Sequence, residues 1–424
     1  MSKLNIGNDL YLKGRIGWRG LSKDEYLKTG DYKIINATAL MDGYIDWNNC
    51  GFISKERYEE SFEIMLQEND ILISKDGTLG KIGFVKNLST PCTIASGIFL
   101  LRNTIPEKLD FDYLYHVLKS DIFKDFIRRN KADGSTINHL YQRDLANFEI
   151  DLPDIETQKK ISNILNALDN KIANNNAINS ELEKMAKTIY DYWFLQFEFP
   201  DENDKPYKSS GGKMVWNEEL KRNIPKKFKV ADILSVCQVI DCLHSKKPSY
   251  AFENEKYYLL TLENLAKDGT IDLSEKFYIS KKDYEEWISR IEVKENDFVV
   301  TNAGRAGDVC KIPKNVKCAI GRNITAIRPT DIDPYYLRCF FKSNYLREQI
   351  LGNLDCGAFF MSFNVKSIKK LKILIPSQTV FDDFIEKVKT IILQIEENII
   401  QNQELASLRD FLLPLLMNGQ VTFK

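Results

Sequence analysis

The chain contains an internal duplication, and two long amphipathic segments show it best. In the first segment, a seam at alternating spacings of four and three residues is formed by Ile161, Leu165, Leu168, Ile172, Asn175, Asn179, Leu182, Ala186 and Ile189. The positions 223 residues later (384 minus 161) are Phe384, Val388, Ile391, Ile395, Asn398, Asn402, Leu405, Arg409 and Leu412. Such spacings are typical of helices that pair in a coiled coil. The repeat is far longer than the unit of a solenoid, so the sequence predicts a duplicated module, each copy followed by a long helix.

Two asparagines occupy the middle of each seam. The approximate two-fold symmetry of a duplication predicts that the helices run antiparallel, with Asn175 facing Asn402 and Asn179 facing Asn398. Buried amides fix the register of such a pair, because a slipped pairing leaves them without hydrogen bonds. Each seam would rise about 42 Å at roughly 1.5 Å per residue. We therefore favour a spacer between two modules over the alternative, a helical bundle that supports two domains.

Composition is that of an ordinary soluble protein. The 424 residues are 43% hydrophobic and 28% charged, enough for roughly two to four domains with cores of their own. The sequence lacks an apolar run long enough for a bilayer and an apolar leader at its N-terminus, so we expect a cytoplasmic protein without a membrane partner. Eight scattered cysteines without a CxxC pair predict reduced, buried thiols and no metal site. The net charge of −1 identifies no partner, because binding depends on where charges cluster.

Both copies follow the same order of elements. Short apolar runs at 71–74 and 98–101 predict buried strands, residues 110–130 have helical periodicity, and an alternating strand at 148–153 ends in proline before the N-cap candidate Asp154. The fold class expected is α+β: two globular modules of mixed α/β content separated by two long antiparallel helices that form a coiled coil, with a pseudo-two-fold repeat. The expected division is a first module at 1–153, a first spacer helix at 154–198, an exposed linker at 199–226, a second module at 227–376, a second spacer helix at 377–418 and a C-terminal tail at 419–424.

A glycine-rich stretch follows the first predicted strand. Residues 76–83 read DGTLGKIG, and the second copy keeps Gly304 and Gly307 but replaces the lysine by Asp308. Glycines that adopt positive φ in a turn explain both copies. A turn whose main-chain NH groups face a DNA backbone is compatible with that interpretation. A nucleotide site is the third reading, although the sequence has no GxxxxGK[ST] motif.

Other resemblances to catalytic motifs have simpler explanations. Asp333-Pro334-Tyr335-Tyr336 is similar to the tetrapeptide of amino-methyltransferases, but it lacks the second proline and is better explained as a helix start. His139 lies near Ser135 and Thr136, as in a hydrolase triad, yet a solvated polar loop is the better explanation. We expect the chain to catalyse no reaction by itself.

The candidate nucleic-acid contacts are polar, basic and aromatic residues near the turns and in the segments where the copies differ most. Arg and Lys suit guanine edges or phosphates, and Asn suits adenine, although a solvated surface would also explain them. The segments 131–139 and 357–364 differ most between the copies, through either different target sequences or ordinary loop drift. The candidates are Arg15, Trp18, Arg19, Lys75, Thr78, Lys81, Lys131, Ser135, Thr136, Asn138, His139, His244, Lys246, Lys247, Asn302, Arg305, Arg322, Asn323, Phe359, Ser362 and Asn364.

These features together resemble one known family. In their order along the chain, they are similar to the specificity subunit of a type I DNA restriction–modification system. The stretches that carry the resemblance are the turn at 73–83, Leu-Pro and Ile-Pro before the helices (152–153 and 375–376), KPYKSSGG at 205–212 followed by MVW at 214–216, and LLPLLMNGQV at 412–421.

The resemblance implies function and partners. Two target recognition domains would each read one half of a bipartite asymmetric site in double-stranded DNA, and the helices would set the spacer between the half-sites. Two modification subunits that bind S-adenosylmethionine would dock on the chain, and restriction subunits that use ATP and Mg²⁺ would join them, so the chain itself would need no cofactor. The alternatives are a scaffold without nucleic-acid contact, or the specificity half of a type II methyltransferase–nuclease.

Overall fold

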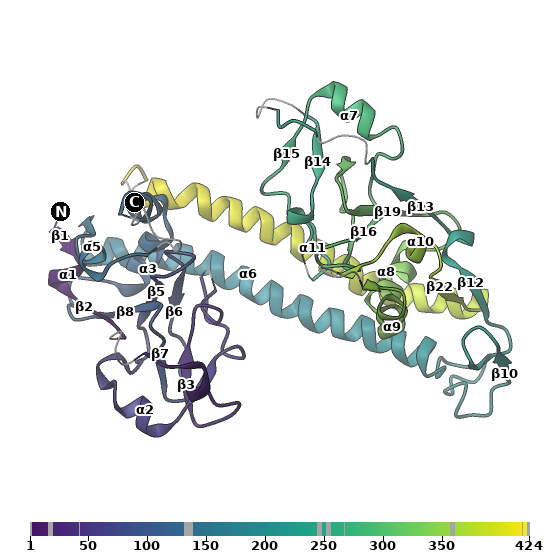
Figure 1. The fold of residues 1–424 in the computed structure, drawn as a ribbon, viewed down its shortest axis with the longest axis horizontal. Coiled ribbons are helices and arrows are strands. Elements are labelled where there is room, and N and C mark those ends of the chain that lie inside the picture. The colour runs from purple at the N-terminus through teal and green to yellow at the C-terminus, as the bar shows by residue number, and fades with distance from the viewer. Residues whose placement is uncertain are drawn as a thin grey trace. The chain divides into compact units, whose positions relative to one another are not determined.

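The computed structural model describes residues 2–15, 20–41, 43–130, 139–243, 248–251, 256–266, 268–356, 361–417 and 419–421. The chain divides into two compact units (Figure 1). Unit 1 comprises residues 1–174 and 401–424, and unit 2 comprises residues 175–400. Each unit therefore contains one of the predicted modules together with part of each long helix.

The two long helices begin and end close to where the sequence placed them. Helix α6 spans Ile155–Tyr190 and continues into a π-helical turn at Asp191–Leu195, and helix α11 spans Gln378–Met417. Asp154 begins α6 as predicted, because its carboxylate accepts a hydrogen bond from the Thr157 amide at 2.9 Å. The seam positions of both helices are buried or half-buried.

The described residues of unit 1 form three small sheets. A four-stranded antiparallel sheet has the order β2-β8-β5-β6, β1 pairs with β9, and a three-stranded sheet has the order β4-β3-β7, in which β3 and β7 are parallel. The strands are β1 (Ser2–Asn5), β2 (Leu10–Gly14), β3 (Tyr32–Ile35), β4 (Gly51–Ile53), β5 (Ile71–Ser74), β6 (Ile82–Phe84), β7 (Cys92–Ile94), β8 (Ile98–Asn103) and β9 (Glu149–Leu152). The helices are α1 (Ile6–Asp9), α2 (Lys55–Glu59), α3 (Phe111–Lys119), α4 (Asp121–Asn130) and α5 (Gln142–Ala146).

Unit 2 repeats this strand order. The equivalent sheets are β13-β19-β16-β17, β12-β22 and β15-β14-β18, and β14 and β18 are again the parallel pair. Unit 2 also contains the antiparallel pairs β10-β11 and β20-β21. The strands are β10 (Met214–Asn217), β11 (Arg222–Pro225), β12 (Lys229–Asp232), β13 (Cys237–Asp241), β14 (Tyr258–Leu260), β15 (Phe277–Tyr278), β16 (Phe298–Thr301), β17 (Val309–Lys311), β18 (Ala319–Ile320), β19 (Ile324–Pro329), β20 (Asp355–Cys356), β21 (Met361–Ser362) and β22 (Lys372–Ile375). The helices are α7 (Lys281–Trp287), α8 (Pro334–Lys342), α9 (Asn344–Gly352) and α10 (Val365–Ile368). The predicted fold class and internal repeat are confirmed.

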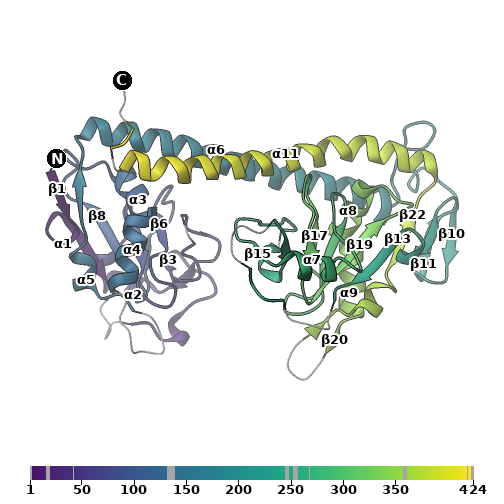
Figure 2. The ribbon, with the colours of Figure 1, turned by 90° about the horizontal axis from the view of Figure 1, so that it is seen from above.

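Two local expectations need correction. The helical stretch at 110–130 is two helices, because Ser120 adopts an extended conformation between α3 and α4 and its hydroxyl donates to Val117 O at 2.6 Å. Ser343 separates α8 from α9 in the same way. The segment 199–226, expected to be an exposed linker, is largely exposed but folded. It carries the β10–β11 hairpin (Figure 2), and its Phe199 is buried and stacks on Phe228 at 5.0 Å between ring centroids.

Both long helices contribute side chains to the core of each unit. In unit 1, Ile161 and Leu165 from the start of α6 and Leu413 and Leu416 from the end of α11 belong to one buried cluster. In unit 2, the end of α6 joins the start of α11 in the same manner, with Phe384 at the centre of an aromatic group. The helix segments are therefore antiparallel within each unit, as the sequence predicted.

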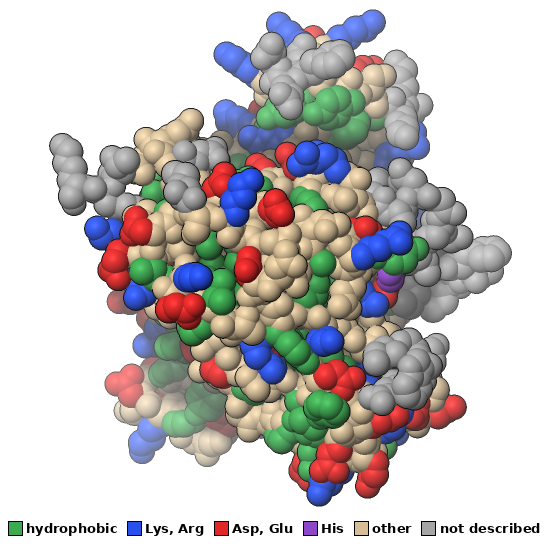
Figure 3. All heavy atoms as spheres, turned by 90° about the vertical axis from the view of Figure 1, so that its left-hand side faces the viewer, with side chains coloured by type: hydrophobic (Ala, Val, Ile, Leu, Met, Phe, Trp, Pro, Cys, Tyr) green, Lys and Arg blue, Asp and Glu red, His purple; other side chains and the backbone are tan. Residues whose placement is uncertain are grey.

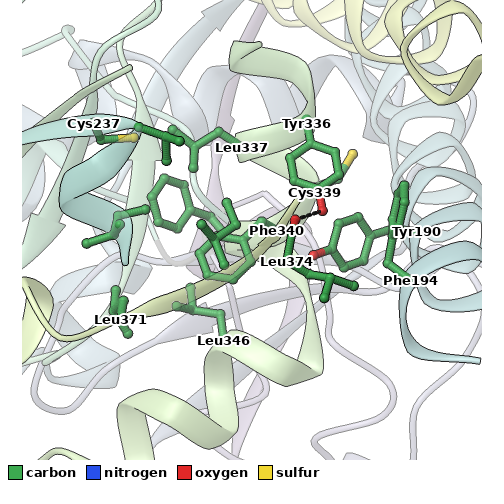
Figure 4. Close-up of a cluster of buried hydrophobic side chains, with 14 of the residues drawn as sticks. Tyr190, Phe194, Cys237, Tyr336, Leu337, Cys339, Phe340, Leu346, Leu371 and Leu374 are labelled. Atoms are coloured by element: carbon green, nitrogen blue, oxygen red, sulfur yellow. Dashed lines mark hydrogen bonds between the residues drawn. The ribbon is translucent and has the colours of Figure 1, made fainter. Parts of the chain in front are cut away.

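The aromatic cluster of unit 2 is shown in Figure 4. Tyr190 and Phe194 of the α6 end face Tyr336 of α8, and the Tyr336 hydroxyl donates to the Leu374 carbonyl of β22. The rings of Phe194 and Tyr336 meet edge to face, with 5.2 Å between their centroids. Burial raises the pKa of Tyr336 well above its usual range. Aromatic side chains bury more area than any others, so this contact anchors the α6 end firmly in the module.

The predicted register of the asparagine layer is confirmed for one pair. Asn398 Nδ2 donates to Asn179 Oδ1 at 2.8 Å, and Gln394 Nε2 donates to Asn398 Oδ1 at 3.1 Å. Asn398 is buried, so these bonds replace the water that its amide loses. The pairing of Asn175 with Asn402 stays a prediction.

We expect the loss of a buried side chain at the end of α11 to destabilise unit 1 selectively. Leu416→Ala should lower the free energy of unfolding by about 2–5 kcal/mol, because it leaves a cavity in the core. Leu408→Ala on the same helix is the control and should have little effect, because Leu408 is 45% exposed. Hydrogen exchange of the β5 amides measures the effect, and equal protection in both variants would contradict the role of the α11 end.

The asparagine pair predicts that a second substitution restores the stability lost by the first. Asn398→Leu alone should destabilise unit 2 by about 1–3 kcal/mol, because the Asn179 carbonyl loses its donor. The double variant Asn179→Leu/Asn398→Leu should recover that loss, since both polar groups are removed together. Urea unfolding of the three proteins is the measurement. A double variant no more stable than the single one would show that the pair does not act through its hydrogen bond.

Candidate nucleic-acid interface

In unit 1, the glycine-rich stretch is the tight turn that joins β5 to β6. Gly77 and Gly80 have φ of 71° and 77°, the left-handed region that glycine adopts without strain. The Ser74 hydroxyl donates to Thr78 O at 2.6 Å and accepts from the Lys81 amide at 2.9 Å. The turn is therefore held by its own chain, which confirms the conformational explanation of its glycines.

The same turn recurs in unit 2 between β16 and β17. Gly304 and Gly307 have φ of 78° and 92°, and Thr301 replaces the serine as the internal support. Its hydroxyl accepts from the Asp308 amide at 3.0 Å, and its carbonyl accepts from the Gly307 amide at 2.8 Å. At Gly77 and at Gly304, an added Cβ would meet none of the described atoms within 4 Å, so both turns expose a bare backbone to solvent.

A second segment, distant along the chain, returns to each turn. In unit 1, the Leu140 amide donates to Lys75 O at 2.9 Å, and His139 forms a β-bridge with Asp76. In unit 2, the Phe363 amide donates to Asn302 O at 2.8 Å, and Ser362 forms a β-bridge with Ala303. The polar segments that differ most between the copies therefore end beside the glycine turns.

Side chains of this return segment form a chain of contacts in unit 1. His139 Nδ1 hydrogen-bonds Asp76 Oδ1, and the imidazole meets the Tyr141 ring edge to face at 4.6 Å between centroids. The Arg143 guanidinium lies over the ring of Tyr141, with 5.1 Å between its Cζ and the ring centroid. The sequence had singled out His139 alone. The spacing of two residues from His139 to Tyr141 and from Tyr141 to Arg143 was the sequence pattern that could have indicated Tyr141 and Arg143 as well.

Arg15 is a correction to the predicted contacts. It is only 4% exposed, and its guanidinium donates to Ile94 O at 2.9 Å, to Ser61 Oγ at 3.1 Å and to Thr93 Oγ1 at 3.4 Å. Burial lowers the pKa of this guanidinium. A group so engaged in the interior holds the end of β2 against β7, and it is not available to a nucleic acid.

Three candidates in unit 2 are also engaged by their own chain. Asn302 Nδ2 donates to Phe363 O at 2.9 Å, and Asn364 Oδ1 accepts from the Ser367 amide at 2.9 Å as the N-cap of α10. Arg305 donates to Leu262 O at 3.1 Å and also to Leu265 O. These side chains shape the turn and its surroundings, so their polar atoms are largely occupied.

The remaining candidates divide into two groups. Exposed or half-exposed positions around the turns hold Lys75, Thr78, Lys81, His139, Arg322, Asn323 and Ser362. Outside the described residues lie Trp18, Arg19, Lys131, Ser135, Thr136, Asn138, His244, Lys246, Lys247 and Phe359. The first group stays a set of predicted contacts around two equivalent turns.

Charge is mixed on the side of the molecule that Figure 3 draws. On the side drawn in Figure 3, Lys and Arg side chains are interspersed with Asp and Glu. Among the described residues, no cluster of three or more His, Cys, Asp or Glu side chains could hold a metal ion. Within the same residues, every helix is too short or too polar to cross a membrane.

A pocket of about 530 Å³ lies beside the glycine turn of unit 1. The turn, the junction of α3 with α4 and the end of α11 line it, with His116 and Arg409 among the lining residues. His116 is 1% exposed, and its Nε2 lies 2.8 Å from Asn166 Oδ1 of α6. Burial is the main reason why its pKa is lowered from the usual 6.5, although Asn166 and Asp169 oppose the shift.

The comparisons with known proteins agree with this geometry. Residues 17–184 match the sequence profile of the family described as "Type I restriction modification DNA specificity domain". The chain is 25% identical over 376 residues to the type I restriction enzyme MjaIX specificity subunit of Methanocaldococcus jannaschii, covering 87% of this chain and 81% of that relative. It is also 25% identical over 429 residues to the MjaVIII specificity subunit of the same organism, covering 98% and 91%.

A solved structure shares the fold. The crystal structure of the S subunit of a type I restriction–modification system from M. genitalium aligns with a TM-score of 0.55 and 17% sequence identity, over 98% of this chain and 95% of that one. The resemblance that the sequence showed to type I specificity subunits is confirmed.

The buried imidazole of His116 predicts a pH-dependent stability. The folded protein binds fewer protons than the unfolded one, because the folded-state pKa of His116 is lowered. Its contribution to stability is therefore complete above about 6.5 and is lost as the pH falls below that value. Urea unfolding between pH 7.5 and pH 5 should show a smaller decrease for His116→Gln than for the wild type, whereas parallel decreases would contradict the assignment.

Proposed function

We propose that this chain, which carries a type I restriction–modification DNA specificity domain, reads a bipartite site in double-stranded DNA with its two modules. Each module would contact one half-site through the glycine turn and the return segment beside it. The chain would supply specificity, and catalysis would belong to the subunits that assemble on it. We assign residues 1–153 and 227–376 to the two target recognition domains.

The observation that carries the proposal is one scaffold repeated with different side chains. The strand orders of the two modules are the same, and the turns are supported by equivalent bonds from Ser74 and Thr301. At the equivalent return positions, however, unit 1 has His139 and unit 2 has Ser362. Equal backbones with unequal polar side chains suit two modules that read different sequences, since base edges are distinguished by side-chain donors and acceptors.

The bare turns fit contact with the phosphate backbone. Main-chain NH groups of exposed turns serve phosphate oxygens and position a protein on the duplex without reading its sequence. Lys75 and Lys81 flank the turn of unit 1 and add positive charge there. In unit 2, Arg305 has turned toward its own chain, so the two modules would bind the backbone with different side chains.

Apolar side chains on the long helices support docking of partner subunits. Met185 in unit 2 and Leu408 in unit 1 are equivalent positions of the repeat, and they are 52% and 45% exposed. Phe411 is 65% exposed one turn beyond Leu408. We propose that two modification subunits that bind S-adenosylmethionine dock along the helices, and that restriction subunits using ATP and Mg²⁺ join that complex.

DNA binding and its dependence on salt test the proposal against a scaffold that does not contact DNA. A protein that neutralises about six phosphates loses roughly a thousandfold in affinity between about 50 and 200 mM salt. We expect the complex of this chain with its modification subunits to show a decrease of that order in filter binding. The modification subunits alone are the control, and equal binding with and without this chain would overturn the proposal.

The spacer role has a separate test. Inserting one heptad into both α6 and α11 should lengthen the unspecified spacer of the methylated site and leave both half-sites unchanged, because the modules themselves are not altered. Methylome sequencing of cells that carry either version reads the result. Changed half-sites, or an unchanged spacer in a complex that still methylates, would contradict the helices as spacer.

A further inference from the structure

We infer that the N-terminal module reads one base of its half-site through Nε2 of His139, and that Asp76 is the positioning residue that determines the role of that nitrogen. The inference rests on the proposed function and adds to it a specific atom and the chemical group that it recognises. The group is an exocyclic amino group of a base, as found on adenine N6 or cytosine N4.

Two contacts hold the imidazole in place. Nδ1 bonds Asp76 Oδ1, and the ring packs against Tyr141 at an interplanar angle of 66°. The backbone under both residues is held as well, because the Leu140 amide donates to Lys75 O and the Lys75 amide donates to Gly97 O, each at 2.9 Å. A side chain held at several points reaches a ligand without losing further rotamer freedom.

The carboxylate determines which ring nitrogen carries the proton. An ionised aspartate can only accept hydrogen bonds, so Nδ1 of His139 must donate to it. In the neutral imidazole, the other nitrogen, Nε2, then has a free lone pair and accepts. In the major groove, the donors that an acceptor can meet are the N6 amino group of adenine and the N4 amino group of cytosine.

Among the described residues, the side chains around His139 are partly exposed. The side chains of Asp76 and His139 are 37% and 30% exposed, and that of Arg143 is 81% exposed. Tyr141 is 45% exposed although it is a large aromatic residue. Among the described atoms, none lies within 4 Å of the Cβ that a residue would have at Gly77, next to Asp76. The imidazole of His139 lies between the bare turn and the exposed Tyr141–Arg143 pair. It is therefore placed to contact a base edge while the turn and the pair contact the DNA backbone.

Unit 2 has no aspartate–histidine pair at these positions. Its equivalents of Asp76 and His139 are Ala303 and Ser362, which form the same β-bridge without an imidazole or a carboxylate. Asn364, the equivalent of Tyr141, caps α10. Substitutions at Asp76 or His139 should therefore affect only the half-site of the N-terminal module, and the other half-site provides an internal control.

Two substitutions of the same histidine distinguish base contact from a structural role. Glutamine places an amide near the position of Nε2, whereas asparagine places one near Nδ1. If Nε2 contacts DNA, His139→Asn should weaken binding about tenfold, the order of one lost hydrogen bond, and His139→Gln should retain more of the affinity. If the histidine serves only its bond to Asp76, the order of the two variants should be reversed.

The measurement uses the full chain with its modification subunits and duplex DNA that carries the site found by methylome sequencing. Each position of the N-terminal half-site is replaced in turn by the three other base pairs. We expect His139→Asn to abolish discrimination at one position whose native base carries the amino group. Asp76→Asn should relax discrimination at the same position, because an amide can donate to Nδ1 or accept from it and so permits both roles of Nε2. Ser362→Ala in unit 2 is the matched control and should leave that position unchanged.

The outcomes separate the two proposals. If the wild-type complex binds DNA but neither Asp76→Asn nor His139→Asn alters discrimination at any position, the inference is wrong and the proposed function stands. Loss of binding by His139→Gln with retention by His139→Asn overturns it as well. A wild-type complex without site-specific binding overturns the proposed function itself. Equal unfolding midpoints of the variants and the wild type confirm that a loss arises at the contact.

Discussion

Neither module is complete without the far end of a helix that begins in the other copy. Leu413 and Leu416 from the end of α11 enter the core that surrounds β5 and β8, which are at least 310 residues away along the chain (413 minus 103). Tyr190, Trp193 and Phe194, near the end of α6, enter the core of unit 2 at the equivalent positions of the repeat. The hydrophobic effect therefore favours burial of the end of each helix in the core of the other copy of the module. The two helices must then run antiparallel, and the register is completed by polar contacts such as Asn179 with Asn398.

This exchange is symmetric in position but not in chemistry. Unit 2 receives three large aromatic side chains, which meet Tyr336 and Phe384 in a dense cluster. Unit 1 receives leucines, and the pocket beside its glycine turn is lined in part by Leu413 and Pro414. Smaller side chains at the same backbone positions fill less space, so the two units differ in packing although their strand order is the same.

The two glycine turns and their return segments, the candidate interface, follow the same principle of a constant backbone with variable side chains. The hydroxyls of Ser74 and Thr301 support equivalent turns. The main-chain amides of the return segments donate equivalent hydrogen bonds to the two turns. Because the backbone satisfies its own hydrogen bonds, the side chains at the crossing can change without loss of the fold. His139 paired with Asp76 in one copy and Ser362 beside Ala303 in the other are two results of that freedom. Specificity can then diverge on a scaffold whose stability depends on other residues.

The sequence alone determined the features that are periodic or repeated. The heptad spacing, the paired asparagines and the common order of strands led to two modules joined by antiparallel helices, because periodicity encodes which face of an element is buried. The conformation of the turn glycines could likewise be predicted, since positive φ is a local requirement. Local patterns do not reveal which distant residues meet, however. Only the tertiary structure decided that Arg15 is an interior residue, that Ser120 divides one predicted helix into two, and that Asp76 orients His139. Each of these depends on groups that lie far apart in the sequence or on a competition between hydrogen bonds that the chain resolves only when it is packed.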